Sequence, residues 1–105
     1  MGFHLLGRWI HTARLTLLDE STVEKAAALR YIEELPAPFV IASGKGALAR
    51  AIERLAVQYG IHCVEEPELA DSLIELGPGA FIPEEYYEII AELLAFVRCL
   101  GRDDE

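Results

Sequence analysis

Four carboxylates lie close together in the chain, at Glu65, Glu66, Glu68 and Asp71. Neighbouring carboxylates can act as general acid and base when their surroundings separate their pKa values. Acids around a proline, here Pro67, are also typical of a solvated helix start, where negative charge complements the helix dipole. Two interpretations stay open: the acids only keep this surface soluble, or they form a docking face for a basic partner. We take these four acids as the candidate partner-binding residues.

The segment Ser43-Gly44-Lys45-Gly46 lies between a predicted strand and a predicted helix. Phosphate groups bind at such junctions because free backbone N–H groups and the helix dipole meet there. The segment lacks the full phosphate-loop pattern, and Lys45 is not placed at the helix start as that loop requires. We therefore predict a plain tight turn. A small anion-binding protein or enzyme that uses this turn is the alternative.

The histidine, cysteine and serine residues form no pattern typical of catalysis or metal binding. His62 and Cys63 are adjacent on a predicted strand, so their side chains point to opposite faces and cannot share a metal ion. His4 and His11 lack a third ligand. The sequence thus predicts no catalytic, cofactor-binding or metal site.

The chain has 105 residues and a formal net charge of −9. This length supports one domain, and no stretch reaches the roughly 20 apolar residues that a bilayer span requires. Strong acidity disfavours nucleic-acid binding, because the chain repels phosphate backbones. Cys63 and Cys99 follow no metal-site spacing, and no secretory signal precedes them, so free thiols in a reducing cytoplasm are expected.

The charge divides the chain unevenly. Residues 1–18 carry two arginines and no acid, whereas residues 19–105 hold all 18 acids. We predict that residues 1–18 are a basic, apolar extension and that residues 19–105 form the single domain. The extension is predicted to contain a short amphipathic helix, although Leu15–Leu18 could equally begin a strand. The apolar residues on one face of this helix are Phe3, Leu6, Ile10 and Ala13.

Hydrophobic periodicity predicts a strand–helix–strand unit in the middle of the chain. Phe39–Ala42 and Ile61–Val64 are short apolar runs typical of buried strands, which should run parallel. The helix between them ends at Gly60, a residue suited to a left-handed cap. Its predicted apolar stripe consists of Leu48, Ile52, Leu55 and Tyr59.

Two further helices are predicted, each opened by a proline. Pro67 begins a short helix, and Pro83 begins a long one over about residues 83–100. The long helix is expected to place Leu93 against the strands at 39–42 and 61–64. Its predicted buried residues are Tyr86, Ile89, Ile90, Leu93, Leu94 and Val97. The fold class is therefore α/β: a small mixed sheet of three to four strands with a βαβ unit, packed by about three to four helices.

An ordered series of residues over about 26–100 resembles the C-terminal cytoplasmic domain of the flagellar and type III secretion export-switch proteins, the FlhB/YscU family. The series begins with Pro36-Ala37-Pro38 and ends with an alanine and an aromatic residue in the last helix. Its members are Ala42-Ser43-Gly44, Ala51-Ile52, Glu65, Pro67, Leu69-Ala70, Leu73, Ile82-Pro83-Glu84-Glu85, Tyr87, Ala91-Glu92, Ala95 and Phe96. The family usually has lysine at Ser43, arginine at Asp71 and an aromatic residue at Ile74. The change at Asp71 reverses a surface charge.

Residues 21–35 allow two interpretations. Ser21-Thr22-Val23-Glu24 has the form of a helix capping box, and the alanines at 26–28 favour helix. The resemblance instead implies a strand over Ala28–Tyr31, and we follow it. That alignment places Ser21, Thr22, Val23 and Glu24 where the family has Asn-Pro-Thr-His, at which its members cut their own backbone by asparagine cyclisation.

This chain contains no asparagine. The resemblance therefore implies a stand-alone switch-domain homologue that does not cleave itself. We expect a non-catalytic cytoplasmic protein, peripheral to the inner membrane at an export gate, that binds export-apparatus components or export substrates. An extension at residues 1–18 would add at most a weak contact with a membrane surface or a partner. The alternative is an interaction module on the same fold with no role in secretion.

Overall fold

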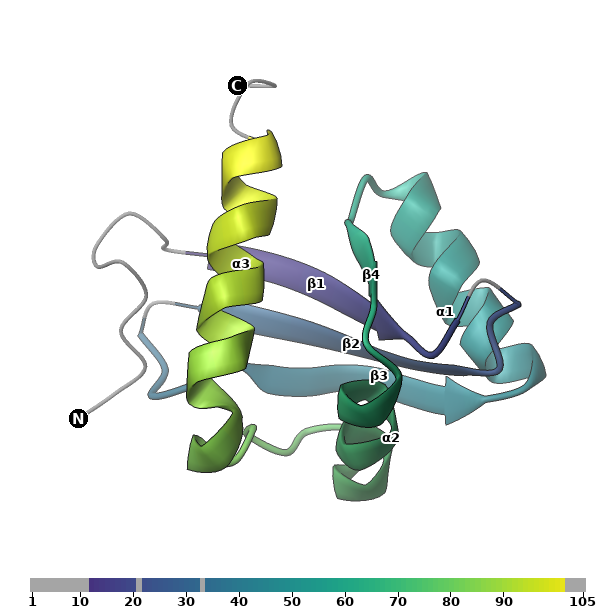
Figure 1. Cartoon of the computed structure of the whole chain (residues 1–105), viewed down its shortest axis with the longest axis horizontal. Helices are drawn as coiled ribbons and strands as arrows, with labels where there is room; N and C mark the ends of the chain where they lie inside the picture. Colours follow the sequence, from purple (N-terminus) through teal and green to yellow (C-terminus); the bar gives the residue numbers. More distant parts are fainter. Residues whose placement is uncertain (1–11, 21, 33, 102–105) are drawn as a thin grey trace.

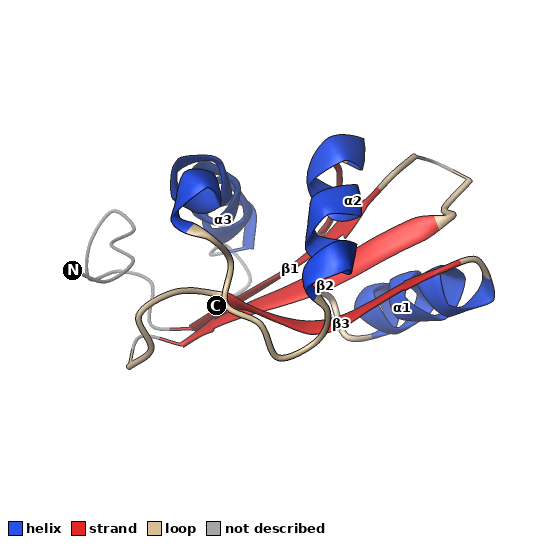
Figure 2. Cartoon of the chain, turned by 90° about the horizontal axis from the view of Figure 1, so that it is seen from below, coloured by secondary structure: helices blue, strands red, loops and turns tan. Residues whose placement is uncertain are grey.

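The computed structural model describes residues 12–20, 22–32 and 34–101, and in it a four-stranded sheet lies between two helical layers (Figures 1 and 2). Helices α2 and α3 cover one face of the sheet and α1 covers part of the other (Figure 2). The elements are β1 Thr12–Leu18, β2 Lys25–Ile32, β3 Phe39–Lys45, α1 Ala47–Gln58, β4 Cys63–Glu65, α2 Pro67–Leu76, the 3₁₀ helix η2 Glu84–Tyr86 and α3 Tyr87–Gly101. The predicted α/β class is confirmed. Among the described residues, no helix combines the length and apolarity needed to cross a membrane.

The strand order is β3-β2-β1-β4. β2 runs antiparallel to both of its neighbours, and β4 pairs with β1 in parallel. β3 and β4 therefore run in the same direction, as expected of the strand–helix–strand unit, but β2 and β1 lie between them. Because the sheet combines antiparallel and parallel pairings, it is mixed. Helix α1 is the crossover connection between β3 and β4.

Residues 12–18 are a central strand of the sheet and not part of an extension. The helix predicted to include Ala13 is wrong there, and the alternative strand at Leu15–Leu18 is confirmed. Leu15 and Leu17 are both 0% exposed. Pairing with a strand on each side satisfies the main-chain polar groups of β1, which allows the segment to be buried. Phe3, Leu6 and Ile10 lie outside the described residues.

β2 confirms the strand that the resemblance implied, and it excludes the helix that the capping box would start. Its alternate side chains reach two separate cores. Ala27 and Leu29 face α2 and α3, while Ala26 and Ala28 face α1. Burial on both faces of a strand outweighs the helical preference of alanine, since propensity differs by less than about 1 kcal/mol per residue.

The tight turn predicted over Ser43–Gly46 is wrong, because β3 continues to Lys45. Ser43 pairs with Ala27 and Gly44 with Ala26. The chain turns into α1 at Gly46 alone, where φ is 61°, a backbone conformation that favours glycine. Gly44 also permits a close approach, since a Cβ at this position would lie 2.4 Å from Leu48 Cδ2.

The predicted stripe of α1 is only partly correct. Ile52 is buried, but Leu48, Leu55 and Tyr59 are about half exposed or more. The helix instead buries its smallest side chains, Ala49 and Ala56, together with Ile52. Ala26 and Ala28 of β2 form the opposing surface, and small residues on both sides allow the helix to lie close to the sheet. Gly60 follows the helix with a φ of 72°, as predicted.

The last two helices largely match their prediction. Pro67 opens α2, which buries Leu69, Ala70 and Leu73. Pro83 precedes the short helix η2, and α3 follows directly.

The predicted burial of α3 needs correction. Ile90 and Leu94 are fully buried, Ile89 is exposed, and Leu93 is only partly buried. The helix α3 packs across β1. In this orientation the side chains of Ile90 and Leu94 point toward the core. The side chain of Val97 is outside the described part of the chain.

Candidate functional site

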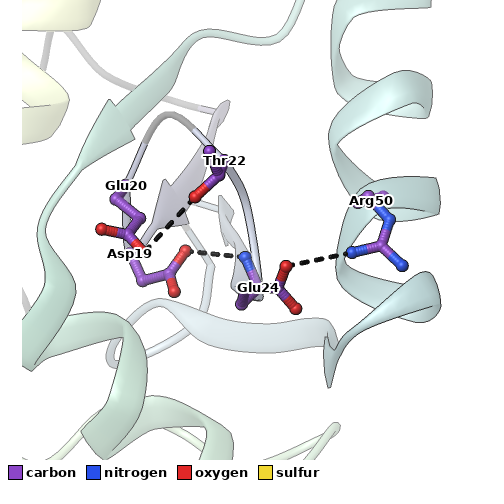
Figure 3. Close-up of polar contacts among 5 residues, drawn as sticks. All are labelled: Asp19, Glu20, Thr22, Glu24 and Arg50. Carbon is purple, nitrogen blue, oxygen red and sulfur yellow. Dashed lines mark hydrogen bonds and ion pairs between the residues drawn. The ribbon is translucent and has the colours of Figure 1, made fainter.

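The turn between β1 and β2 holds the positions aligned with the family's cleavage motif. Ser21 lies outside the described residues. Thr22 is exposed, and its hydroxyl donates to Glu20 Oε2 at 3.4 Å. Val23 is only 3% exposed and packs in the core beneath α1. Glu24 is exposed and forms an ion pair of 3.3 Å with Arg50 on α1 (Figure 3).

The conformation of this turn is set by main-chain hydrogen bonds. The backbone N–H of Glu24 donates to Asp19 Oδ1 at 3.0 Å (Figure 3). The N–H of Gly46 donates to the carbonyl oxygen of Glu24 at 2.8 Å, which joins the turn to the start of α1. The buried Val23 side chain and these bonds join the end of the turn to Asp19 and to the start of α1.

Burial raises the pKa of the Asp19 carboxyl, but backbone N–H donors, led by that of Glu24, outweigh this effect, so its pKa is lowered. A carboxylate with a lowered pKa stabilises the fold above its unfolded pKa of about 3.9, and this stabilisation is lost as the pH falls through the lower folded value.

We expect Asp19→Ala to lower the free energy of unfolding by about 1 kcal/mol at pH 7, because the Glu24 N–H loses its acceptor. The deficit should shrink as the pH falls below the unfolded pKa of about 3.9 and through the lower folded value. Urea denaturation at pH 7 and at acidic pH checks this, with Thr22→Ala as the control in the same turn. An equal deficit at both pH values would contradict the role given to the charged carboxylate.

The acids predicted as a docking face gather at the junction of β4 and α2. Glu65 ends β4 and is exposed, Glu66 precedes α2, and Glu68 is exposed in its first turn. The N–H of Glu66 donates to the carbonyl oxygen of Leu18 at 2.8 Å, so this junction is tied to the end of β1. We call Glu65, Glu66 and Glu68 the acidic edge.

Asp71 differs from these three acids because it has a basic partner. Its Oδ1 lies 3.0 Å from Lys25 Nζ, and both side chains are partly exposed. The hydrogen bond and the charge of Asp71 raise the pKa of Lys25. This ion pair joins α2 to the first residue of β2, directly after the turn.

The turn and the start of α2 flank one shallow depression of about 330 Å³. Its lining residues are Asp19, Glu20, Lys25, Pro67, Glu68 and Asp71. The structure therefore brings the motif-aligned turn next to two of the four predicted docking acids. Sequence reasoning missed Asp19, Glu20 and Lys25, although the acidic pair directly before the aligned motif was a visible signal.

The other candidates lie apart from this depression. Ser43 and Lys45 are on β3, and Cys63 is half buried at the start of β4, where burial raises the pKa of its thiol. Within the described ranges, no group of three or more His, Cys, Asp or Glu side chains is arranged to hold a metal ion.

The chain matches the sequence profile of the FlhB HrpN YscU SpaS family over residues 23–97. This match spans the end of the turn, the strands from β2 onward, the helices α1, α2 and η2, and most of α3.

The chain belongs to this family.

Individual members agree with this assignment. The flagellar biosynthetic protein FlhB of Buchnera aphidicola subsp. Schizaphis graminum is 40% identical over 77 residues, which are 71% of this chain but 20% of that protein. YlqH of Bacillus subtilis (strain 168) is 36% identical over 80 residues, 75% of this chain and 86% of YlqH. The crystal structure of the cytoplasmic domain of FlhB from Shewanella putrefaciens matches with a TM-score of 0.77 at 32% identity, over 86% of this chain and 72% of that one. The chain is thus similar to the cytoplasmic domain of FlhB, and it spans about a fifth of the length of the Buchnera protein.

Proposed function

We propose that this FlhB-family domain acts in a flagellar or type III protein export apparatus, on the cytoplasmic side of the inner membrane, by binding protein partners. The observation that carries the proposal is the match to the FlhB HrpN YscU SpaS family over residues 23–97, together with the match to the cytoplasmic domain of FlhB. Export components or export substrates are the proposed class of partner.

The acidic edge is the proposed contact for a basic segment of the partner. Glu65 and Glu68 are exposed and Glu66 is partly exposed, whereas Lys25, the cation that lines the adjacent depression, is already paired with Asp71. Among the described residues, the carboxylates of the edge form no ion pair, so they remain open to a cation from outside. Attraction between exposed charges chiefly speeds association and is screened by salt.

The test is a triple variant, Glu65→Gln, Glu66→Gln and Glu68→Gln. We expect it to bind isolated cytoplasmic domains of export-apparatus components at least about tenfold more weakly at low salt, with a flatter salt dependence. Asp71 is left intact so that its ion pair with Lys25 is preserved. Surface plasmon resonance at several salt concentrations gives both quantities.

A matched variant removes the same charge elsewhere: Glu84→Gln, Glu88→Gln and Glu92→Gln, all at exposed positions. It should bind like wild type. Equal losses of affinity in the two variants would mean that only the net charge matters. Unchanged binding in both variants would mean that the acidic edge does not contact the partner.

We further propose that the domain has no catalytic activity and does not cut its own backbone. Asparagine is absent from the sequence, Val23 is buried in the core, and the carboxylate of Glu24 is paired with Arg50. No residue at the positions aligned with the cleavage motif has the side-chain amide that forms a cyclic imide.

Intact-mass spectrometry after several days at neutral pH should show one full-length species. A pair of fragments that meet between residues 20 and 25 would contradict this proposal. Fragments that meet elsewhere would indicate contaminating protease, and adding inhibitors would abolish them.

A further inference from the structure

Two arginines and two phenylalanines form one row across the sheet. In the strand register, Arg14 of β1 is opposite Arg30 of β2, and Arg30 is opposite Phe39 of β3. Phe39 forms an isolated bridge with Phe81, which extends the row beyond the sheet edge. The two rings meet edge to face with their centroids 6.4 Å apart. Directly opposed residues of antiparallel strands project to the same face, so these four side chains share one surface.

The row lies on the α1 side of the sheet, beyond the end that α1 covers. Along β2, Ala26, Ala28 and Arg30 alternate onto one face, and the first two of them pack beneath α1. Arg30 follows them toward the opposite end of the strand and is exposed. Figure 2 shows α1 below one end of the sheet, with α3 above the other end. Among the described residues, no helix covers the sheet beneath Arg14 and Arg30.

Within the described part of the chain, the two arginines differ from the cations that form ion pairs. Lys25 is paired with Asp71 and Arg50 with Glu24, whereas Arg14 and Arg30 are both exposed and face each other. Like charges directly opposite each other on neighbouring strands repel and destabilise the sheet. An anion held between the two guanidinium groups would relieve this repulsion, and guanidinium groups favour carboxylates through paired hydrogen bonds.

The aromatic end of the row adds an apolar contact. Phe81 is 49% exposed and Phe39 is partly exposed, so a ligand at the arginines also meets ring surface. A ligand that fits both ends carries carboxylates beside apolar or aromatic side chains. Single-stranded nucleic acid also combines anions with rings, but it carries a charge on every nucleotide. A chain of net charge −9 repels it more strongly than a peptide segment with a few carboxylates.

We propose that the row Arg14–Arg30–Phe39–Phe81 binds an extended acidic segment of a protein partner, with carboxylates at the arginines and an apolar side chain at the phenylalanines. This surface is on the α1 side of the sheet and shares no residue with the acidic edge. The two proposals can therefore be tested independently of each other.

The test measures fluorescence anisotropy of the full chain with a labelled peptide that carries two aspartates and a phenylalanine at every second position, with serine between them, so that all three side chains share one face when the peptide is extended. We expect binding that weakens with salt. The double variant Arg14→Gln and Arg30→Gln should lower the affinity at least about tenfold, as loss of charge-assisted contacts predicts. Lys45→Gln with Arg54→Gln removes two exposed charges elsewhere and should leave the affinity within about twofold.

Further measurements complete the test. Phe81→Ala should weaken the aspartate–phenylalanine peptide severalfold and leave an aspartate–glycine peptide unchanged. Thermal melting should show that the double arginine variant and an Arg14→Gln single variant are both folded. The single variant should be at least as stable as wild type, because the repulsion between the two arginines is removed. Equal affinity for a peptide with asparagine in place of aspartate would overturn the proposal. So would tighter binding of an oligothymidine, or self-association that disappears in the Arg14→Gln and Arg30→Gln variant.

Discussion

Replacing Leu94 by alanine is expected to lower the free energy of unfolding by about 2–5 kcal/mol, the range for truncating a buried leucine. Leu94 is 1% exposed on α3 and belongs to the larger core, which also contains Leu15, Leu17 and Ile90. Removing its isobutyl group would leave a cavity between α3 and the sheet. Chemical denaturation monitored by circular dichroism measures the change.

Leu93→Ala is the matched control on the same helix. Because Leu93 is only partly buried, its truncation should cost clearly less than that of Leu94. A larger loss at Leu93 than at Leu94 would show that α3 is rotated relative to the orientation described here.

Val23→Asp should be the most damaging single change in the turn between β1 and β2, with a loss of about 3 kcal/mol or more. Val23 is 3% exposed and packs in the cluster that contains Leu18, Ala49 and Ile52. A carboxylate at this position would be buried among apolar side chains, and burying an unpaired charge is far more costly than losing a methyl group. Thermal denaturation at neutral pH measures the effect.

Thr22→Asp introduces the same charge at the neighbouring exposed position. It should change stability by less than about 0.5 kcal/mol, as is usual for surface substitutions. Similar losses in the two variants would mean that the turn responds to added negative charge rather than to a charge buried in the core.

Some features of the protein followed directly from local sequence. Pro67 marked the start of α2 and Gly60 the end of α1, because a missing N–H and a positive φ are properties of single residues. Family membership was also readable, since it depends on an ordered series of residues along the chain. The absence of asparagine is likewise a fact of the sequence alone.

Other features depend on pairings between distant residues. The segment around Leu15 became the centre of the sheet only because β4 pairs with β1 in parallel, and sequence patterns do not specify which strands become neighbours. The alanines of β2 prefer helix locally, but burial on both faces of the strand decided their conformation.

The surfaces proposed for binding also required the tertiary structure. Lys25 and Asp71 are 46 residues apart in the chain and 3.0 Å apart in the fold. The row that contains Arg14, Arg30 and Phe39 exists only through the strand register, since a slip of one residue would move alternate side chains to the opposite face. Sequence determined which chemical groups the protein has and where several helices begin and end. Strand order and register decided which of those groups share a surface.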